Sequence, residues 1–233
     1  MPIKMFVNGI DMSTYNCTLL TREVQPSEVM TFSDWLPKSL DPLYTGKKVK
    51  YLTIKCQTLV EGTSDEACLT SISNIVLLMT KCILKFEDIN LYYDCTIETP
   101  ETTRLDEGIY ALVFEAKASG ACMPEVSQTF TEKVKTLTVA GNLDISAILT
   151  ITPAIGLGSV LITGFGRDIT IHNLSANVPI VIDGTACLVT ANSVNKFADV
   201  DMWAFPSLKP GSNPITINQN GITWNVKYKP KFM

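Results

Sequence analysis

The sequence contains few charged residues and little to suggest a nucleic-acid surface. Charged residues make up 18% of the 233 positions, against 46% hydrophobic residues, and the formal net charge is −4 with a pI near 5.1. Such an apolar composition excludes a disordered chain and supports a packed core. Phosphate binding relies on clustered Lys and Arg, so we expect no sequence-specific binding to nucleic acid.

The sequence also lacks an apolar run long enough to cross a membrane. Its longest apolar stretches, such as Ile75–Met79 and Ile145–Ile151, fall well short of the roughly 18 residues that a spanning helix requires. The segment Met1–Asn8 has neither the apolar core nor the cleavage site of a signal peptide. We therefore expect no membrane span and synthesis in the cytoplasm.

The cysteines show no spacing typical of a metal site. There are seven of them, an odd number, with no CxxC pair and a single histidine in the chain. Several replace an apolar residue within an apolar pattern, as Cys56 does in Leu52–Cys56, which favours reduced core thiols over disulfides. We predict that the fold uses no metal and no cofactor.

Motifs of the common enzyme classes are missing as well. The sequence contains no GxSxG, HExxH or GxxxxGK[ST] pattern. The only histidine, His172, lies in the alternating run Asp168–Asn173, on the face opposite Ile169 and Ile171. This position favours an exposed strand residue over a catalytic base. We predict that the protein is not an enzyme.

The distribution of charge divides the chain in two. Charged residues are frequent up to about residue 134 and sparse over Lys135–Asn225, and a turn at Pro124 precedes the change. The prediction is an N-terminal domain over residues 1–133, a C-terminal domain over 134–225 and a basic tail over 226–233.

The first domain has the pattern of a β-barrel or sheet covered by one helix. Lys50–Cys56 alternates polar and apolar residues, as a half-buried strand does. Apolar residues over about 64–81 recur at spacings of three and four, which indicates an amphipathic helix. Thr63 and Glu66 have the spacing of a capping box at its start. Further strands are expected at Lys4–Val7, Ile83–Phe86, Leu91–Ile97 and Ile109–Ala116.

The second domain is predicted to be an antiparallel β-sandwich or jelly roll. Short strand-like runs are separated by turn signals such as Pro153 and Pro210-Gly211. Asp183-Gly184 and Asn220-Gly221 are expected to form tight hairpin turns, because Asn-Gly and Asp-Gly adopt the positive φ angles of type I′ turns.

Three exposed-looking apolar residues of the first domain are a further sign of function. Phe32, Trp35 and Leu36 lie between Pro26 and Pro37, outside any clear periodic element. They are candidates for self-association through an arm that reaches a neighbouring subunit, and packing on their own domain is the open alternative.

Two aromatic residues of the second domain could likewise be either core or surface residues. Trp203 and Phe205 lie in a mixed polar stretch. We expect them to anchor the core, with a contact surface as the alternative.

The order of these segments resembles the distal tail protein family of long-tailed phages that infect Gram-positive hosts. The resemblance spans nearly the whole chain, and Asn195–Asn213 is its most specific block. It rests on Trp35-Leu36, Leu40–Leu43, Lys47–Lys55, Leu59–Gly62, Leu84–Asp88, Tyr92-Tyr93, Tyr110–Glu115, Asp168–Ile171, Val181–Gly184, Asn195–Pro206 and Leu208–Asn213.

The resemblance implies a mainly β protein whose N-terminal domain forms a ring and whose C-terminal domain is a galectin-like antiparallel β-sandwich. The family's rings are hexameric and join the tail tube to the tip proteins of the virion, next to the end of the tape measure protein. The expected function is thus that of a structural subunit of the tail tip or baseplate. The alternatives are a carbohydrate-binding adsorption protein of the tail tip and a tail-tube-type structural protein.

Overall fold

The computed structural model describes residues 3–233 and shows a mainly β protein with two compact units, one ending at Cys122 and the other covering Met123–Phe232. The predicted boundary at residue 133 is therefore too late. Strand β10 (Val126–Phe130) belongs to the second unit because it pairs along its whole length with β21 (Ile222–Tyr228). The predicted basic tail is also wrong, since β21 extends to Tyr228.

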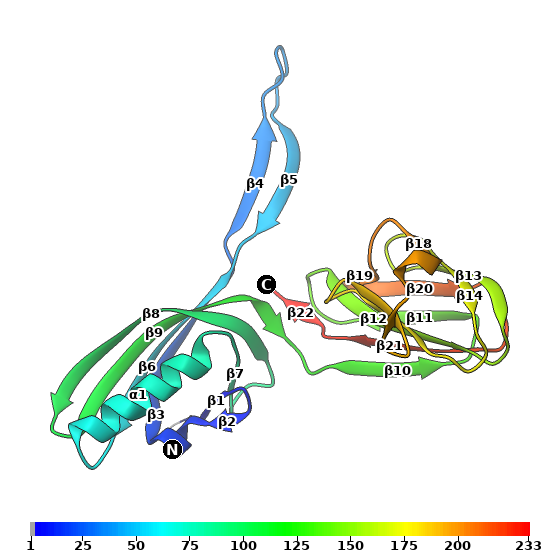
Figure 1. Cartoon of the computed structure of the whole chain (residues 1–233). Helices are drawn as coiled ribbons and strands as arrows, with labels where there is room; N and C mark the ends of the chain where they lie inside the picture. The colour runs from blue at the N-terminus through cyan, green and yellow to red at the C-terminus, as the bar shows by residue number, and fades with distance from the viewer. Residues whose placement is uncertain (1–2) are drawn as a thin grey trace. The chain divides into compact units, whose positions relative to one another are not determined.

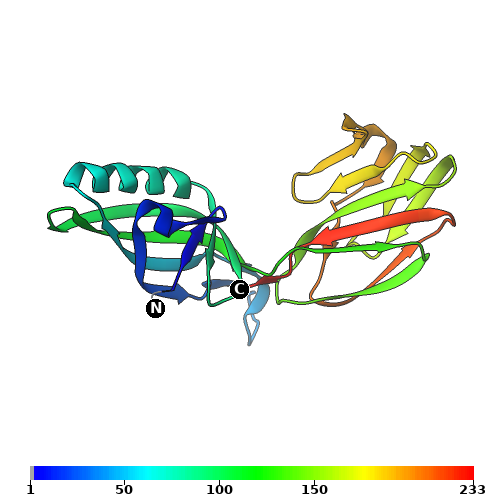
Figure 2. The same cartoon turned by 90° about the horizontal axis from the view of Figure 1, so that it is seen from below.

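The first unit is built around one antiparallel sheet that a helix covers on one face (Figures 1 and 2). The strands follow the order β2-β1-β7-β8-β9-β6-β3. Their bounds are β1 (Met5–Val7), β2 (Ile10–Asp11), β3 (Cys17–Gln25), β6 (Leu52–Glu61), β7 (Cys82–Phe86), β8 (Tyr92–Asp106) and β9 (Ile109–Cys122), and a short 3-10 helix covers Met12–Tyr15. Strand β6 alternates as predicted, because Leu52, Ile54 and Cys56 point into the core under the helix.

The helix, α1 (Asp65–Met79), buries the stripe that its sequence spacing predicted, including Cys68, Ile72 and Ile75. Its N-cap, however, is Ser64, whose hydroxyl oxygen accepts a hydrogen bond from the Ala67 N–H at 3.2 Å. The capping box expected at Thr63 is therefore wrong by one residue. No helix among residues 3–233 is long and apolar enough to cross a membrane.

A charged side chain joins parts of the first sheet that lie far apart in its strand order. Both guanidinium N–H groups of Arg22 on β3 donate to the carboxylate of Asp88 at 2.6 Å, and the guanidinium lies 4.5 Å from the centre of the Phe86 ring. Three strands separate β3 from β7 in the sheet. The sheet must therefore curl for this contact to form, which agrees with the barrel form of the predicted barrel or sheet. The same guanidinium lowers the pKa of Asp88 from its usual value.

The second unit is an antiparallel β-sandwich, as predicted. Two sheets, β10-β21-β12-β15-β16-β17 and β11-β20-β13-β14-β18, enclose one core, and β19 pairs with β12. The remaining bounds are β11 (Val134–Val139), β12 (Ile145–Pro153), β13 (Leu157–Thr163), β14 (Ile169–Leu174), β15 (Ile180–Asp183), β16 (Leu188–Ala191), β17 (Val194–Asn195), β18 (Val200–Met202), β19 (Ser207–Leu208), β20 (Gly211–Ile217) and β22 (Lys231–Phe232), with a 3-10 helix over Phe197–Asp199.

Both predicted hairpin turns of this unit differ from the expectation. Strands β15 and β16 do pair, but Asp183 lies opposite Leu188, so four residues form the loop instead of two. Gly184 is needed for a close approach, because a Cβ there would lie 2.5 Å from the carbonyl oxygen of Pro206. Asn220-Gly221 connects β20 to β21, which belong to different sheets, and so makes no hairpin.

Two tryptophans of the second unit differ in burial and so allow a matched test of how much the core contributes to stability. Trp224 is 1% exposed, its indole N–H donates to the carbonyl oxygen of Glu132 at 2.9 Å, and its ring lies 4.6 Å from that of Phe130. Trp203 is 97% exposed, so the prediction that it anchors the core is wrong.

We predict that Trp224→Ala lowers the free energy of unfolding by roughly 3–5 kcal/mol, because it leaves a large cavity. Trp203→Ala should change it by no more than about 0.5 kcal/mol. Urea unfolding of both variants beside the parent protein measures the difference. Equal destabilisation by the two substitutions would contradict the burial described here.

Candidate assembly surface

The most exposed apolar surface of the first unit is a two-stranded hairpin, here called the arm (residues 29–49). Strands β4 (Val29–Asp34) and β5 (Leu43–Val49) pair with each other and form a sheet of their own. All six residues of β4 are exposed. Figure 1 shows the arm extending away from the curled sheet of its unit. An isolated hairpin is at best marginally stable in water, so contacts from another surface are expected to support it.

The root of the arm explains why it extends in this way. The last pair of the β3–β6 ladder is Gln25 with Thr53, and the first pair of the arm is Val29 with Val49. Three residues separate these pairs on each strand, so the arm continues the β3–β6 hairpin in the same register. Pro26 interrupts the ladder because it has no N–H to donate.

Two contacts bridge the interruption. The Lys50 backbone N–H donates to the Glu28 carbonyl oxygen at 2.8 Å, and the Lys50 ammonium group lies 2.7 Å from the Glu28 carboxylate. The ion pair is exposed, so we attribute little stability to it. The backbone bond keeps the two strands of the root together.

The tip of the arm, residues 35–42, is restricted by its own sequence. Pro37 and Pro42 limit the backbone angles, and the Ser39 N–H donates to the Leu36 carbonyl oxygen at 3.0 Å. A restricted tip loses less entropy when it binds a partner than a flexible loop does.

The structure brings all three predicted self-association residues onto the arm. The exposed fractions are 45% for Phe32, 66% for Trp35 and 54% for Leu36. Two thirds of the Trp35 surface is therefore left uncovered by its own domain. Other exposed apolar residues of the arm were not predicted: they are Val29, Met30, Leu40, Leu43 and Tyr44. The sequence did offer one sign of strand β4: Met30 and Phe32 are two residues apart, which is the period of a strand.

A hollow of about 430 Å³ lies at the root of the arm. Its lining combines apolar surface with lysine side chains and consists of Met30, Lys48, Val49, Lys50, Tyr51 and Ser119. Its lining contains no acid, histidine or thiol. It is suited to receive an apolar side chain.

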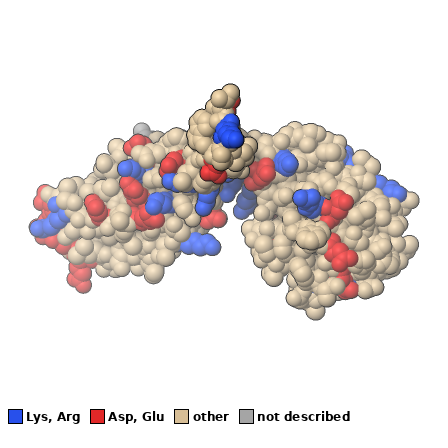
Figure 3. Space-filling view, turned by 90° about the horizontal axis from the view of Figure 1, so that it is seen from above, with Lys and Arg blue, Asp and Glu red and all other residues tan. Residues whose placement is uncertain are grey.

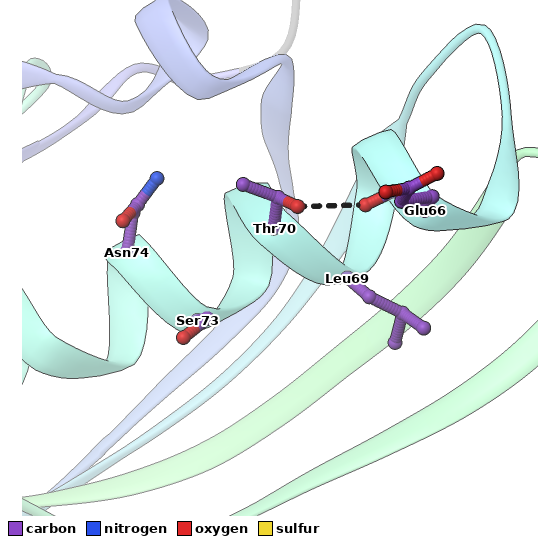
Figure 4. A pocket seen from close by; sticks show the side chains of 5 residues that line it. All are labelled: Glu66, Leu69, Thr70, Ser73 and Asn74. Atoms are coloured by element: carbon purple, nitrogen blue, oxygen red, sulfur yellow. Dashed lines mark hydrogen bonds between the residues drawn. The ribbon is translucent and has the colours of Figure 1, made fainter.

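The outer face of α1 carries a second, shallow hollow of about 510 Å³, lined by Glu66, Leu69, Thr70, Ser73 and Asn74. The Thr70 hydroxyl donates to the Glu66 backbone carbonyl within the helix at 2.9 Å, and Leu69 points away from Thr70 and Asn74 (Figure 4). The side chains do not converge on one point. This arrangement has no catalytic or ligand-binding geometry.

The second unit holds the one histidine in a polar network on the sandwich surface. His172 Nε2 lies 2.9 Å from the Asp201 carboxylate, as expected for the exposed face of its strand. Asp199 accepts hydrogen bonds from Lys196 and Asn173, which lower the pKa of its carboxyl. No group of three His, Cys, Asp or Glu side chains in residues 3–233 is arranged as a metal site.

Charge does not suggest a nucleic-acid surface either. Lys and Arg are interspersed with Asp and Glu on the face shown in Figure 3. Direct ion pairs such as Lys55 with Glu115 and Lys117 with Glu98 neutralise much of the basic charge of β6 and β9. The distinctive surface is apolar, not basic.

Comparison with known proteins gives a family match for most of the second unit. Residues 140–232 match the model of the siphovirus-type tail component, C-terminal domain. No curated protein matches the chain in sequence.

Solved structures extend the likeness to the first unit. The chain is similar to the Dit protein (gp 19.1) of phage SPP1, with a TM-score of 0.77 and 12% identity over 100% of both chains. It is also similar to a chain of the activated phage P2 baseplate with Ca, with a TM-score of 0.57 and 10% identity over 100% of both chains. For the p2 baseplate with Sr, the TM-score is 0.56 at 10% identity, over 100% of this chain and 99% of the other. At these identities the likeness concerns the fold.

We predict that Trp35→Ala leaves the stability of the dissociated subunit within about 0.5 kcal/mol of the parent, because an exposed side chain loses little on truncation. Thermal unfolding at concentrations below self-association measures this. A large drop in Tm would mean that Trp35 packs on its own domain.

Proposed function

We propose that this chain is a distal tail protein, a proposal supported by the match of residues 140–232 to the siphovirus-type tail component, C-terminal domain. In this role it is a structural, non-enzymatic subunit of the tail tip or baseplate. The first unit assembles into a ring, most simply a hexamer, that joins the tail tube to the tip proteins. The likeness in fold to the SPP1 protein, described as the hub of an adsorption apparatus, supports this proposal over the full chain.

The observation that carries the proposal is the arm. A ring built head to tail needs two different surfaces on each subunit, one that reaches out and one that receives. The arm is the reaching surface, because its apolar side chains are exposed and its backbone is held in one direction by the β3–β6 ladder. The hollow beside Met30, Val49 and Tyr51 is the candidate receiving surface.

The remaining partners follow from the position of such a ring in a particle. We propose contacts with the tail tube protein, the end of the tape measure protein and the tail tip protein. The protein is then located in the virion at the tail tip, after synthesis in the host cytoplasm.

One observation favours the carbohydrate-binding alternative. Trp203 is 97% exposed directly after β18, and an exposed aromatic ring suits stacking against a sugar. A glycan array probed with the parent protein and Trp203→Ala tests it. Binding that the substitution abolishes would favour an adsorption protein. Stacking of rings into long tubes under the electron microscope would instead favour a tail-tube-type protein.

We predict that Trp35→Ala weakens ring assembly, because truncating a buried interface anchor commonly costs about 2 kcal/mol, or roughly thirtyfold in affinity for each contact. Phe32→Ala should act in the same direction. Mass photometry across a dilution series measures the fraction of rings.

The matched control is Trp203→Ala, which removes an equally large exposed side chain from the second unit and should leave the ring fraction unchanged. Rings that form equally well in all three variants would remove the arm from the interface while leaving the family assignment intact. A parent protein that stays monomeric at every concentration would contradict the ring itself.

A further inference from the structure

Two cysteines of the first unit face each other inside the sheet. Cys82 on β7 and Cys95 on β8 are directly opposite in the antiparallel ladder. Their sulfur atoms are 3.6 Å apart, and the residues are 5% and 2% exposed. Both are free thiols. They are therefore adjacent, reduced and separated from bulk solvent.

The backbone geometry of this pair is compatible with a covalent bond. Opposite residues of antiparallel strands have Cα atoms about 4.5 or 5.5 Å apart. Disulfides span Cα separations of about 4.4–6.8 Å, so closing the bond needs small side-chain rotations and no shift of the strands. The neighbour of Cys95 on its other side is Ala118 on β9, whose short side chain limits the crowding around the sulfur.

Two irregular points in the chain lie beside the pair. Cys82 is the first residue of β7 and follows Thr80 and Lys81, both exposed, at the end of α1. The β8–β9 ladder has an irregularity between Tyr93 and Cys95, where strand pairing is locally disrupted. Local opening at these two points needs less free energy than unfolding of the unit.

We propose that Cys82 and Cys95 form a redox-active pair that hydrogen peroxide, or another small peroxide, converts into an intramolecular disulfide. The thiolate of Cys82 attacks one peroxide oxygen, which gives a sulfenic acid and releases hydroxide. The sulfur of Cys95 then attacks the sulfenic sulfur and displaces a second hydroxide. With the two thiol protons, the products are one disulfide and two water molecules, so two electrons pass from the thiols to the peroxide.

We assign the first step to Cys82, because it begins β7 beside the exposed Lys81, whereas Cys95 lies inside β8. The Cys82 and Cys95 sulfurs share a hydrogen bond in which either can be the donor; this contact lowers the pKa of Cys82, whereas the same contact and burial raise the pKa of Cys95. Thiolate is the reactive form, so Cys82 is the nucleophile and Cys95 resolves the sulfenic acid. This inference does not depend on the proposed function. Disulfides persist in the oxidising surroundings outside a cell, which a released particle would enter.

Tryptic mapping after peroxide treatment tests the bond directly. Cleavage at Lys81, Lys85 and Arg104 leaves Cys82 on the peptide Cys82–Lys85 and Cys95 on the peptide Phe86–Arg104. The expected product, under non-reducing conditions, is these two peptides joined by a disulfide that a reductant separates. Recovery of both peptides with free or over-oxidised thiols, at peroxide levels that oxidise the exposed Cys187, would overturn the proposal.

A stability measurement on the same samples gives a second readout. The cross-link closes a short loop across the hairpin, so the oxidised full-length protein should melt about 5 °C or more above the reduced protein. Cys187→Ser, which removes an exposed thiol of the second unit, should keep this rise. Cys82→Ala and Cys95→Ala should each abolish it. A rise that survives Cys95→Ala would assign the effect to other thiols and contradict the pairing.

Discussion

The β3–β6 ladder is the constraint on which the functional surface depends. Its final pair, Gln25 with Thr53, sets the direction in which two chain segments leave the curled sheet, and the arm resumes pairing in the same register. A long loop at this point would sample many directions. Two strands held at their root sample few, so the apolar side chains of the arm are presented in a nearly fixed arrangement.

The distinctive feature of the first unit is the set of exposed apolar side chains on its arm. Apolar side chains such as Trp35 and Leu40 are left in water. An exposed side chain of this kind contributes little to the stability of its own subunit and is available to a partner. A structural role in an assembly explains this pattern more simply than catalysis does.

Much of the fold followed from local patterns in the sequence. The spacing of Cys68, Ile72 and Ile75 predicted α1, and alternation over Lys50–Cys56 predicted the buried face of β6. These patterns report which side of an element is apolar, and this depends on near neighbours in the chain. The domain boundary failed because β10 pairs with β21, about a hundred residues later, and no local pattern encodes such a pairing.

The sequence by itself determined that the protein is mainly β, that it lacks catalytic motifs, and that Phe32, Trp35 and Leu36 are apolar residues outside a predicted core. Only the tertiary structure decided which tryptophan is exposed. Trp203 and Trp224 each have an apolar residue two positions away in the sequence, yet one is 97% and the other 1% exposed. The reason is physical: burial depends on what lies across the core, and strands distant in the chain supply those contacts.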